Sequence, residues 1–175
     1  IWEKTYGGTE YDELRSIHQT SDGGIIAVGQ SSSFRPIGEI WVIKIDQNGN
    51  IDWQKRYEGI FSSIANFVRQ TLDGGYIIAG TGDGDVWILK LNNSGDIVWQ
   101  KKYGGIENES AYCIIETSDG GYVVAGETYS FGSDNADFWI FKIDGNGNLI
   151  SGWPKKYGGS GYDTARSIQQ TADAG

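Results

Sequence analysis

Apolar and polar residues alternate along short runs that recur through the chain at intervals of about 50 residues. In the run 40–46, Trp41 and Ile43 fall on one side of an extended chain, while Lys44 falls on the other. The run 51–57 alternates in the same way. A side-chain period of two predicts β-strands, so we expect an all-β protein.

Glycine-rich turns separate these runs. Ser21-Asp22-Gly23-Gly24 lies between the apolar-tinged run 14–20 and the run 25–29, and Asn48-Gly49 lies between 40–46 and 51–57. Both turns are typical of hairpins that join antiparallel strands, because glycine adopts positive φ angles at low cost. Four such runs predict one four-stranded antiparallel sheet per repeat, and a sheet with two apolar faces must pack against neighbours.

Tyr-Gly-Gly or its variant, Asp-Gly-Gly and a single tryptophan recur along the chain at a common spacing, and these three motifs define the repeat. The intervals between successive members are 51, 46 and 54 residues for Trp2, Trp53, Trp99 and Trp153. Strand-rich repeats of this length are typical of β-propeller blades. We therefore predict a single β-propeller segment over 1–175, with three complete blades at about 11–57, 62–103 and 108–157 and a lone strand at each end, 1–6 and 162–171. We expect further sequence or a partner chain to complete the ring.

Composition excludes several functional classes. The formal net charge is −9, and the 14 Lys and Arg residues are spread through the repeats, which disfavours nucleic-acid partners and anionic membrane surfaces. Membrane insertion is not expected, since no apolar run approaches the roughly 20 residues that span a bilayer. Cys113 is the single cysteine, so no internal disulfide can form.

The repeats also resemble a known group of proteins. The segments KIDQNGNIDWQKRY, KLNNSGDIVWQKKY and KIDGNGNLISGWPKKY resemble the Trp-containing blade endings of quinoprotein-like propellers. Together with TSDGGIIAVG, TLDGGYIIAG and TSDGGYVVAG, they are more similar still to repeats of secreted or cell-surface proteins of bacteria and archaea. The resemblance implies blades and an extracellular or surface location. It does not imply quinone chemistry, because the chain lacks the adjacent cysteines and the site motif of quinoprotein dehydrogenases.

Variation between the repeats is concentrated in one loop, which points to a binding face. The interval from Gly29 to Trp41 is 12 residues, whereas it is 7 from Gly80 to Trp87 and 13 from Gly126 to Trp139. This loop and the blade-to-blade connections emerge on one side of the sheets, and diverse loops on a rigid scaffold often carry recognition. The candidate ligand-binding residues on this side are Phe34, Arg35, Asp83, Asp85, Tyr129, Phe131, Asp134, Asn135 and Asp137.

The individual motifs that suggest chemistry are weak. Gly82-Asp83-Gly84-Asp85 is a calcium candidate, but two carboxylates are too few without partners, and we expect no other cofactor. We expect His18 to be solvated or satisfied, and Cys113 to fill a core position, because neither has a catalytic partner in the sequence. The Asp22 and Lys44 positions recur in the complete repeats, which favours framework ion pairs.

We accordingly expect a non-catalytic binding or scaffolding propeller whose ligand is a carbohydrate or a protein, bound on the variable-loop face or at the channel mouth. Two alternatives stay open. One is a lyase or hydrolase that uses carboxylates at the channel mouth, with or without calcium. The other is a structural repeat that self-associates through open blade edges.

Overall fold

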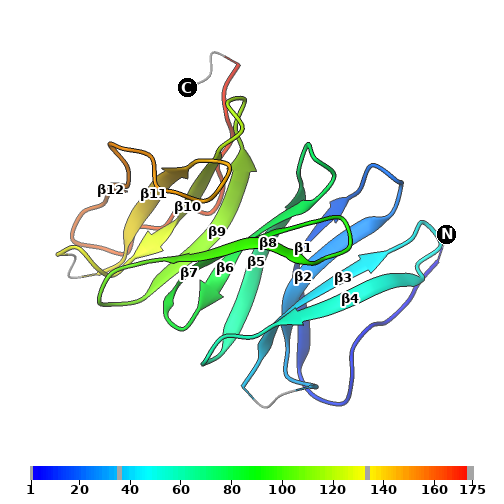
Figure 1. Cartoon of the computed structure of the whole chain (residues 1–175). Helices are drawn as coiled ribbons and strands as arrows, with labels where there is room; N and C mark the ends of the chain where they lie inside the picture. Colours follow the sequence, from blue (N-terminus) through cyan, green and yellow to red (C-terminus); the bar gives the residue numbers. More distant parts are fainter. Residues whose placement is uncertain (1, 35–36, 133–134, 173–175) are drawn as a thin grey trace.

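Three four-stranded antiparallel sheets make up the fold (Figure 1). The computed structural model describes residues 2–34, 37–132 and 135–172. Every regular element in this part is a strand, so the predicted all-β class is confirmed. No helix among these residues has the length and apolarity needed to cross a membrane.

The strands follow one another in space in the same order as in the chain. The first sheet has the order β1 (Asp12–Gln19), β2 (Ile25–Ser31), β3 (Glu39–Ile45), β4 (Ile51–Tyr57). The second has the order β5 (Ser63–Gln70), β6 (Tyr76–Gly82), β7 (Asp85–Leu91), β8 (Ile97–Tyr103). The third consists of β9 (Glu109–Glu116), β10 (Tyr122–Thr128), β11 (Asp137–Ile143), β12 (Lys155–Tyr157).

The core lies between the sheets. One apolar cluster joins the first sheet to the second through residues such as Val42 and Leu89, and another joins the second to the third through residues such as Ile88 and Phe141. All of β3 is buried, as is all of β7 except its first residue, because both faces of these strands are covered. Each sheet therefore depends on its neighbours for burial, as the repeat predicted.

In the first and second sheets, the last tyrosine binds the sheet to the next one. The hydroxyl of Tyr57 donates to the carbonyl of Gly95 at 2.5 Å, and that of Tyr103 donates to the carbonyl of Gly147 at 2.7 Å. Both rings are buried, whereas the equivalent Tyr157 is 55 % exposed. No further sheet lies beyond the third in the described structure, so the burial of this position depends on a following sheet.

The two terminal segments differ from the prediction of a lone strand at each end. Residues 2–6 and 162–171 contain no strand. They nevertheless lie where the predicted strands would lie: the hydroxyl of Tyr6 donates to the carbonyl of Gly49 at 2.8 Å, and the amide of Ala165 donates to the carbonyl of Gly126 at 3.1 Å. A strand needs a neighbouring strand for its ladder, and none lies beside these segments within the described ranges.

A β-bulge interrupts the first strand of each sheet, opposite a glycine that recurs in all three sheets. A β-carbon on Gly29, Gly80 or Gly126 would stand about 2 Å from a backbone carbonyl oxygen of the bulged strand, so only glycine fits. The side chain of each bulged residue stands outside the regular alternation of the strand. The bulged residues are Arg15, Asn66 and Tyr112.

Ion pairs hold each Asp-Gly-Gly turn to the middle of its sheet. Lys44 and Lys90 are buried, and their ammonium groups lie 2.9 Å from Asp22 and 2.8 Å from Asp73. Hydrogen bonds from Thr20 and Lys44 lower the pKa of Asp22 to about 2. Burial acts to raise the pKa of Asp73, but hydrogen bonds from Lys90 and Thr71 outweigh it and lower that pKa to about 2 as well. The expected framework role of these residues is confirmed.

Because of these ion pairs, acid destabilises the folded protein. A carboxylate whose pKa is depressed on folding stabilises the folded protein above its unfolded pKa near 3.8, and loses that effect as the pH falls towards 2. We expect the free energy of unfolding, measured by urea denaturation, to fall as the pH is lowered from about 5 to about 2. Asp73→Asn should flatten this decline. An equal decline in the variant would contradict the assignment. The effect is moderated by solvent, since both carboxylates are more than half exposed.

The third sheet departs from the pattern at its outer edge. Pro154 occupies the position of Gln54, whose side chain accepts a hydrogen bond of 3.1 Å from the indole of Trp41 in the first sheet. The equivalent indole nitrogen of Trp139 is buried without a partner. Proline also cannot donate to a ladder, and β12 is an edge strand of three residues.

Candidate functional site

The loops that vary in length lie along one edge of the three sheets, which we call the loop edge (Figure 1). It comprises the loops that join the second and third strand of each sheet, together with the connections between sheets. Backbone hydrogen bonds join the two kinds of segment. The amide of Ser63 donates to Gly38 at 3.3 Å, that of Glu109 donates to Gly84 at 2.7 Å, and that of Asp163 donates to Ala136 at 2.8 Å. The loop edge is therefore one continuous surface.

Phe34 lies on this edge with its ring 46 % exposed. The guanidinium of Arg56, on β4, lies 4.0 Å from the ring centroid and supports the ring from the sheet side. The predicted neighbour Arg35 lies outside the described residues. The first sheet thus contributes one supported aromatic ring to the loop edge.

The third sheet contributes a larger aromatic group. Tyr129 is 37 % exposed, and its ring meets that of Tyr162 edge-on at 6.4 Å. Phe131 is 54 % exposed, and its ring lies 5.9 Å from that of the buried Trp139. Phe131 also has a φ of 61°, a conformation that is rare for a bulky residue. Strain at an exposed ring is typical of functional loops.

The two predicted acidic residues of the second sheet have different surroundings. Asp83 pairs with Lys102 and accepts the amide of Phe61 at 2.5 Å, so it links its loop to the preceding connection. Burial acts to raise the pKa of Asp83, but the hydrogen bonds outweigh it and the pKa is lowered. Asp85 opens β7, and burial together with the nearby carboxylate of Glu109 raises its pKa.

The remaining polar candidates belong to the third sheet. Asp137 is buried and lies 2.8 Å from the ammonium of Lys156. The side-chain amide of Asn135 donates to the carbonyl of Ser160 at 2.8 Å, which ties the loop to the following connection. Asp134 lies outside the described residues. Asp137 and Asn135 therefore hold the edge together.

The acidic residues do not form an evident metal or acid–base site. No three His, Cys, Asp or Glu side chains gather in an arrangement suited to a metal within the described ranges, Asp83 and Asp85 included. Asp85 and Glu109 do converge, because each has an oxygen within 2.4 Å of where a β-carbon on Gly104 would stand. Glu109 is only 1 % exposed, however, and it accepts hydrogen bonds from Gly105 at 2.8 Å and Thr128 at 2.7 Å. Its contacts are those of a buried structural carboxylate.

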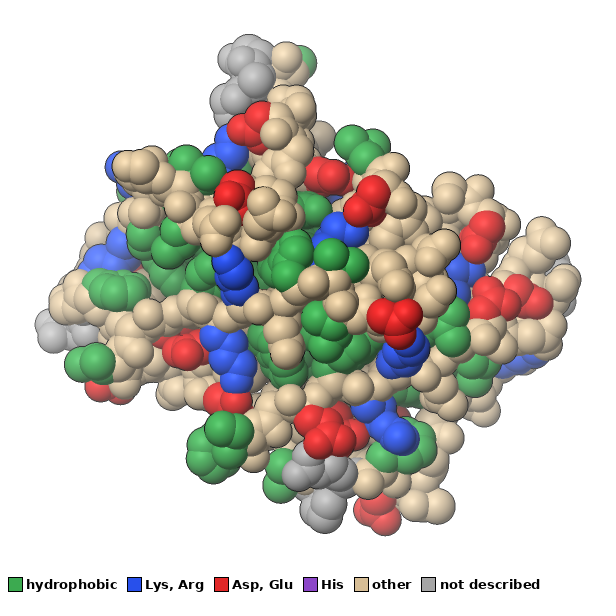
Figure 2. All heavy atoms as spheres, in the orientation of Figure 1, with side chains coloured by type: hydrophobic (Ala, Val, Ile, Leu, Met, Phe, Trp, Pro, Cys, Tyr) green, Lys and Arg blue, Asp and Glu red, His purple; other side chains and the backbone are tan. Residues whose placement is uncertain are grey.

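The sequence reasoning missed a set of exposed apolar residues on the same edge. Ile60 is 77 % exposed, Phe61 is 67 % exposed and Ile106 is 94 % exposed, and all three lie in connections between sheets. Ile37 is also exposed at this edge. Apolar side chains in otherwise polar connections were the signal that could have found them. Figure 2 shows separate hydrophobic groups along the lower rim of the molecule.

A hollow of about 390 Å³ opens where the second sheet meets this edge. Ile60 and Glu58 line it from the connection, and Asp83 and Trp87 line it from the second sheet. The ammonium of Lys102 lies 5.1 Å from the centroid of the Trp87 ring. The hollow thus combines apolar surface with a few charged groups, a composition common in binding sites.

The expectation for Cys113 is confirmed. Its side chain is buried in an apolar cluster with Ala125 and Ala165, and burial raises the pKa of its thiol. A protonated, enclosed thiol is a poor nucleophile.

Comparison with known proteins gives likeness of fold alone. No protein-family model matches the chain, and no curated protein matches it. The structure is similar to the crystal structure of a protein of unknown function from Bacteroides caccae, with a TM-score of 0.58 and 19% sequence identity. The fold is shared. The likeness covers 93% of this chain and 51% of that chain, so this chain spans about half the length of the Bacteroides protein.

Proposed function

We propose that the chain is a segment of a β-propeller that serves as a non-catalytic binding unit, and that it binds a protein through the loop edge. Support for the radial arrangement comes from the contacts between sheets. The innermost strand β5 contacts both β1 and β9, whereas no comparable contact joins β4 to β8 among the described residues. Sheets that converge on one side and diverge on the other are typical of propeller blades.

The observation that carries the proposed function is the uneven distribution of exposed apolar side chains. On the loop edge the exposed large residues are Tyr11, Phe34, Ile37, Ile60, Phe61, Ile106, Tyr129, Phe131 and Tyr162. Six of these are more than half exposed. In and beside the glycine-rich turns of the opposite edge, the exposed large residues in the described structure are Trp2, Ile51, Leu72, Ile97, Val98, Leu149 and Ile150, of which only Leu72 and Val98 are more than half exposed. Apolar groups rimmed by polar residues are typical of protein-binding surfaces.

The chemistry of the edge favours a protein over a glycan. Exposed isoleucines such as Ile60 and Ile106 do not stack on sugar rings, but they do fill apolar pockets of a protein partner. Aromatic rings on rigid supports, such as Phe34 and Phe131, act as anchors with little loss of conformational entropy. An extracellular or cell-surface setting is part of the proposal, and it is based on the resemblance of the repeats.

Selection of peptides from a phage-displayed library against the chain tests this proposal, because such peptides collect at natural binding surfaces. We expect the selected peptides to lose about tenfold or more in affinity for Phe131→Ser and Ile106→Ser. The matched control, Leu72→Ser, removes an equally exposed apolar residue from the opposite edge and should leave affinity unchanged.

Two outcomes would overturn the proposal. Selected peptides whose affinity falls equally in the Leu72→Ser control would show that the loop edge is not special. If no peptide binds, and a glycan array yields a ligand whose binding depends on Phe131 or Tyr129, the partner is a carbohydrate and not a protein.

A further inference from the structure

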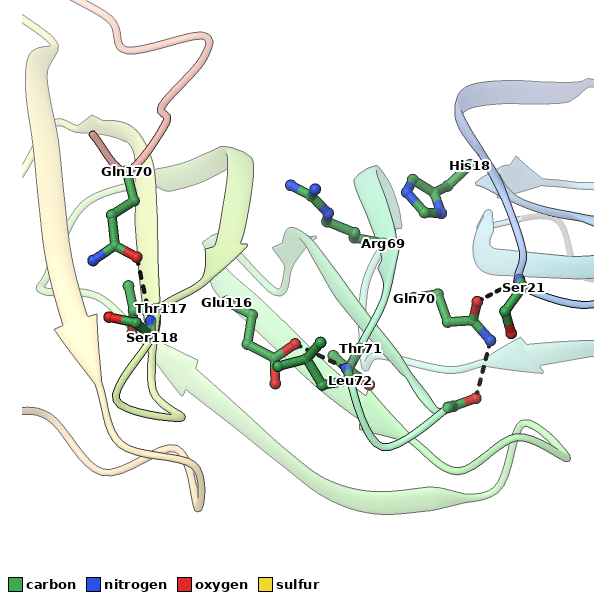
Figure 3. Close-up of a pocket in the computed structure, with 11 residues that line it drawn as sticks. His18, Ser21, Arg69, Gln70, Thr71, Leu72, Glu116, Thr117, Ser118 and Gln170 are labelled. Atoms are coloured by element: carbon green, nitrogen blue, oxygen red, sulfur yellow. Dashed lines mark hydrogen bonds between the residues drawn. The ribbon is translucent and has the colours of Figure 1, made fainter. Parts of the chain in front are cut away.

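A hollow of about 570 Å³ lies on the other side of the molecule, beside the glycine-rich turns (Figure 3). The ends of the innermost strands β1, β5 and β9 and the terminal segment near Gln170 surround it. It is separate from the loop edge and does not depend on the function proposed for that edge. Its volume is that of a typical small-ligand site.

One position in the wall of this hollow has a structural role in each repeat. At this position a side-chain oxygen of one repeat accepts a backbone amide from the turn of the preceding repeat, which fixes the spacing of the sheets. The pairs are Gln70 with Ser21 at 2.8 Å, Glu116 with Leu72 at 3.0 Å, and Gln170 with Ser118 at 3.2 Å.

The neighbouring position has no such role. It is occupied by His18, Arg69, Ile115 and Gln169 in the four repeats, so its chemistry changes while its place in the fold stays the same. In Figure 3, the imidazole of His18 points from β1 towards β5, and the guanidinium of Arg69 extends away from β5 into the open space. A variable position within an invariant frame is suited to ligand recognition.

Both of these side chains lack partners. Arg69 makes no hydrogen bond or ion pair with any described residue, whereas Arg15 pairs with Glu13 at 3.1 Å and Lys90 with Asp73 at 2.8 Å. The Nδ1 atom of His18 is buried without a hydrogen-bond partner. An exposed guanidinium without an ion-pair partner and an imidazole that line the same hollow are groups to which an anionic ligand can bind.

We propose that this hollow binds a small hydroxylated carboxylic acid, the chemistry of a uronic acid, with its carboxylate on Arg69 and His18. The planar fork of a guanidinium matches the two oxygens of a carboxylate. The oxygen of Gln170 is occupied by Ser118, so its amide group remains available to donate to a ligand hydroxyl. The carboxylate of Glu116, on β9, also lines the hollow, where it accepts the amide of Leu72 at 3.0 Å.

The site predicts a dependence on pH. Burial and the charge of Arg69 lower the pKa of His18, so the imidazole of the free protein is neutral at pH 7. The charged groups that face it are Arg69 on β5 and, across the hollow, Glu116 on β9. A bound carboxylate favours the protonated imidazole, so binding takes up a proton. Affinity therefore rises as the pH falls through the range below about 6.5, where a carboxylic acid is still ionised.

His18 is the single histidine of the chain, so its imidazole resonances in an NMR spectrum report on this site without ambiguity. We would titrate galacturonic acid into the whole chain and record these resonances and the heat of binding between about pH 5 and 8. The expected result is saturable binding and a raised His18 pKa in the complex. The same titration with gluconate, a hydroxy acid without a sugar ring, shows whether the site requires the ring of the uronic acid.

The variants decide whether the hollow is responsible. Arg69→Gln should lose about tenfold or more in affinity, and His18→Gln should bind with little dependence on pH. Arg166→Gln is the matched control, because it removes another exposed guanidinium, which lies outside the hollow and over the Tyr112 ring at 3.9 Å.

Three results would overturn the proposal: no saturable binding of either acid, equal losses in Arg69→Gln and Arg166→Gln, or His18 resonances that do not respond to the ligand. If the Arg69→Gln variant does not fold, the ligand-induced change in the His18 pKa of the unaltered chain still tests the proposal.

Discussion

Ile88→Ala should lower the free energy of unfolding by about 4 kcal/mol. Ile88 is 0 % exposed and lies between the second and third sheets, where the substitution removes apolar contacts and leaves a cavity in a core that cannot easily collapse. Denaturation by guanidinium chloride, followed by tryptophan fluorescence, measures the loss. A chain of this length should show a fall in Tm of about 8–16 °C.

Ile140→Ala is the matched control. Ile140 pairs with Ala125 in the third sheet as Ile88 pairs with Ala79 in the second, but no fourth sheet covers it in the described structure, and it is only partly buried. We expect a loss of about 1 kcal/mol. Equal losses for the two variants would mean that packing between sheets is not the main source of stability.

Gly80→Ala should cost at least about 3 kcal/mol, although it adds a single methyl group. The added β-carbon would stand 2.0 Å from the carbonyl oxygen of Ile64 and 2.9 Å from the α-carbon of Ala65. Both atoms belong to the backbone of β5, so the strand itself must move, and the bulge at Asn66 must change with it. Thermal denaturation measures the effect, with unfolding followed by the circular dichroism band of β-sheets at about 218 nm.

Gly161→Ala tests whether the cost comes from the close approach of two strands. A β-carbon at Gly161 would meet no atom within 4 Å, and its φ lies outside the range that favours glycine. We expect a change within about 0.5 kcal/mol. A small effect at Gly80 as well would show that the bulged strand adapts freely, contrary to the packing described above.

The candidate site could be predicted only in part. The difference in loop length located the loop edge, and Phe34, Tyr129 and Phe131 do expose their rings there. The acidic candidates were a different matter, because an aspartate in a loop looks the same in sequence whether it faces a ligand or a lysine. Asp83 and Asp137 proved to pair with Lys102 and Lys156, which lie 19 residues further along the chain in each case.

His18 shows the same limit in the opposite direction. A single histidine on a strand suggested a solvated or satisfied side chain. The structure instead places it beside Arg69, which lies in the next repeat, in a hollow that also includes Gln170 from the end of the chain. No local pattern connects three residues from different repeats. Their proximity follows from the stacking of sheets.

The sequence by itself determined the strands of the three sheets, the turns between them and the order of strands within each sheet. Alternation, Asp-Gly-Gly and Asn-Gly turns and a regular period are local signals that neighbouring residues reinforce. Tertiary structure decided what each repeated residue does. Tyr103 is buried and Tyr157 is exposed in the same motif, and their surroundings differ only because a further sheet covers the first and not the second.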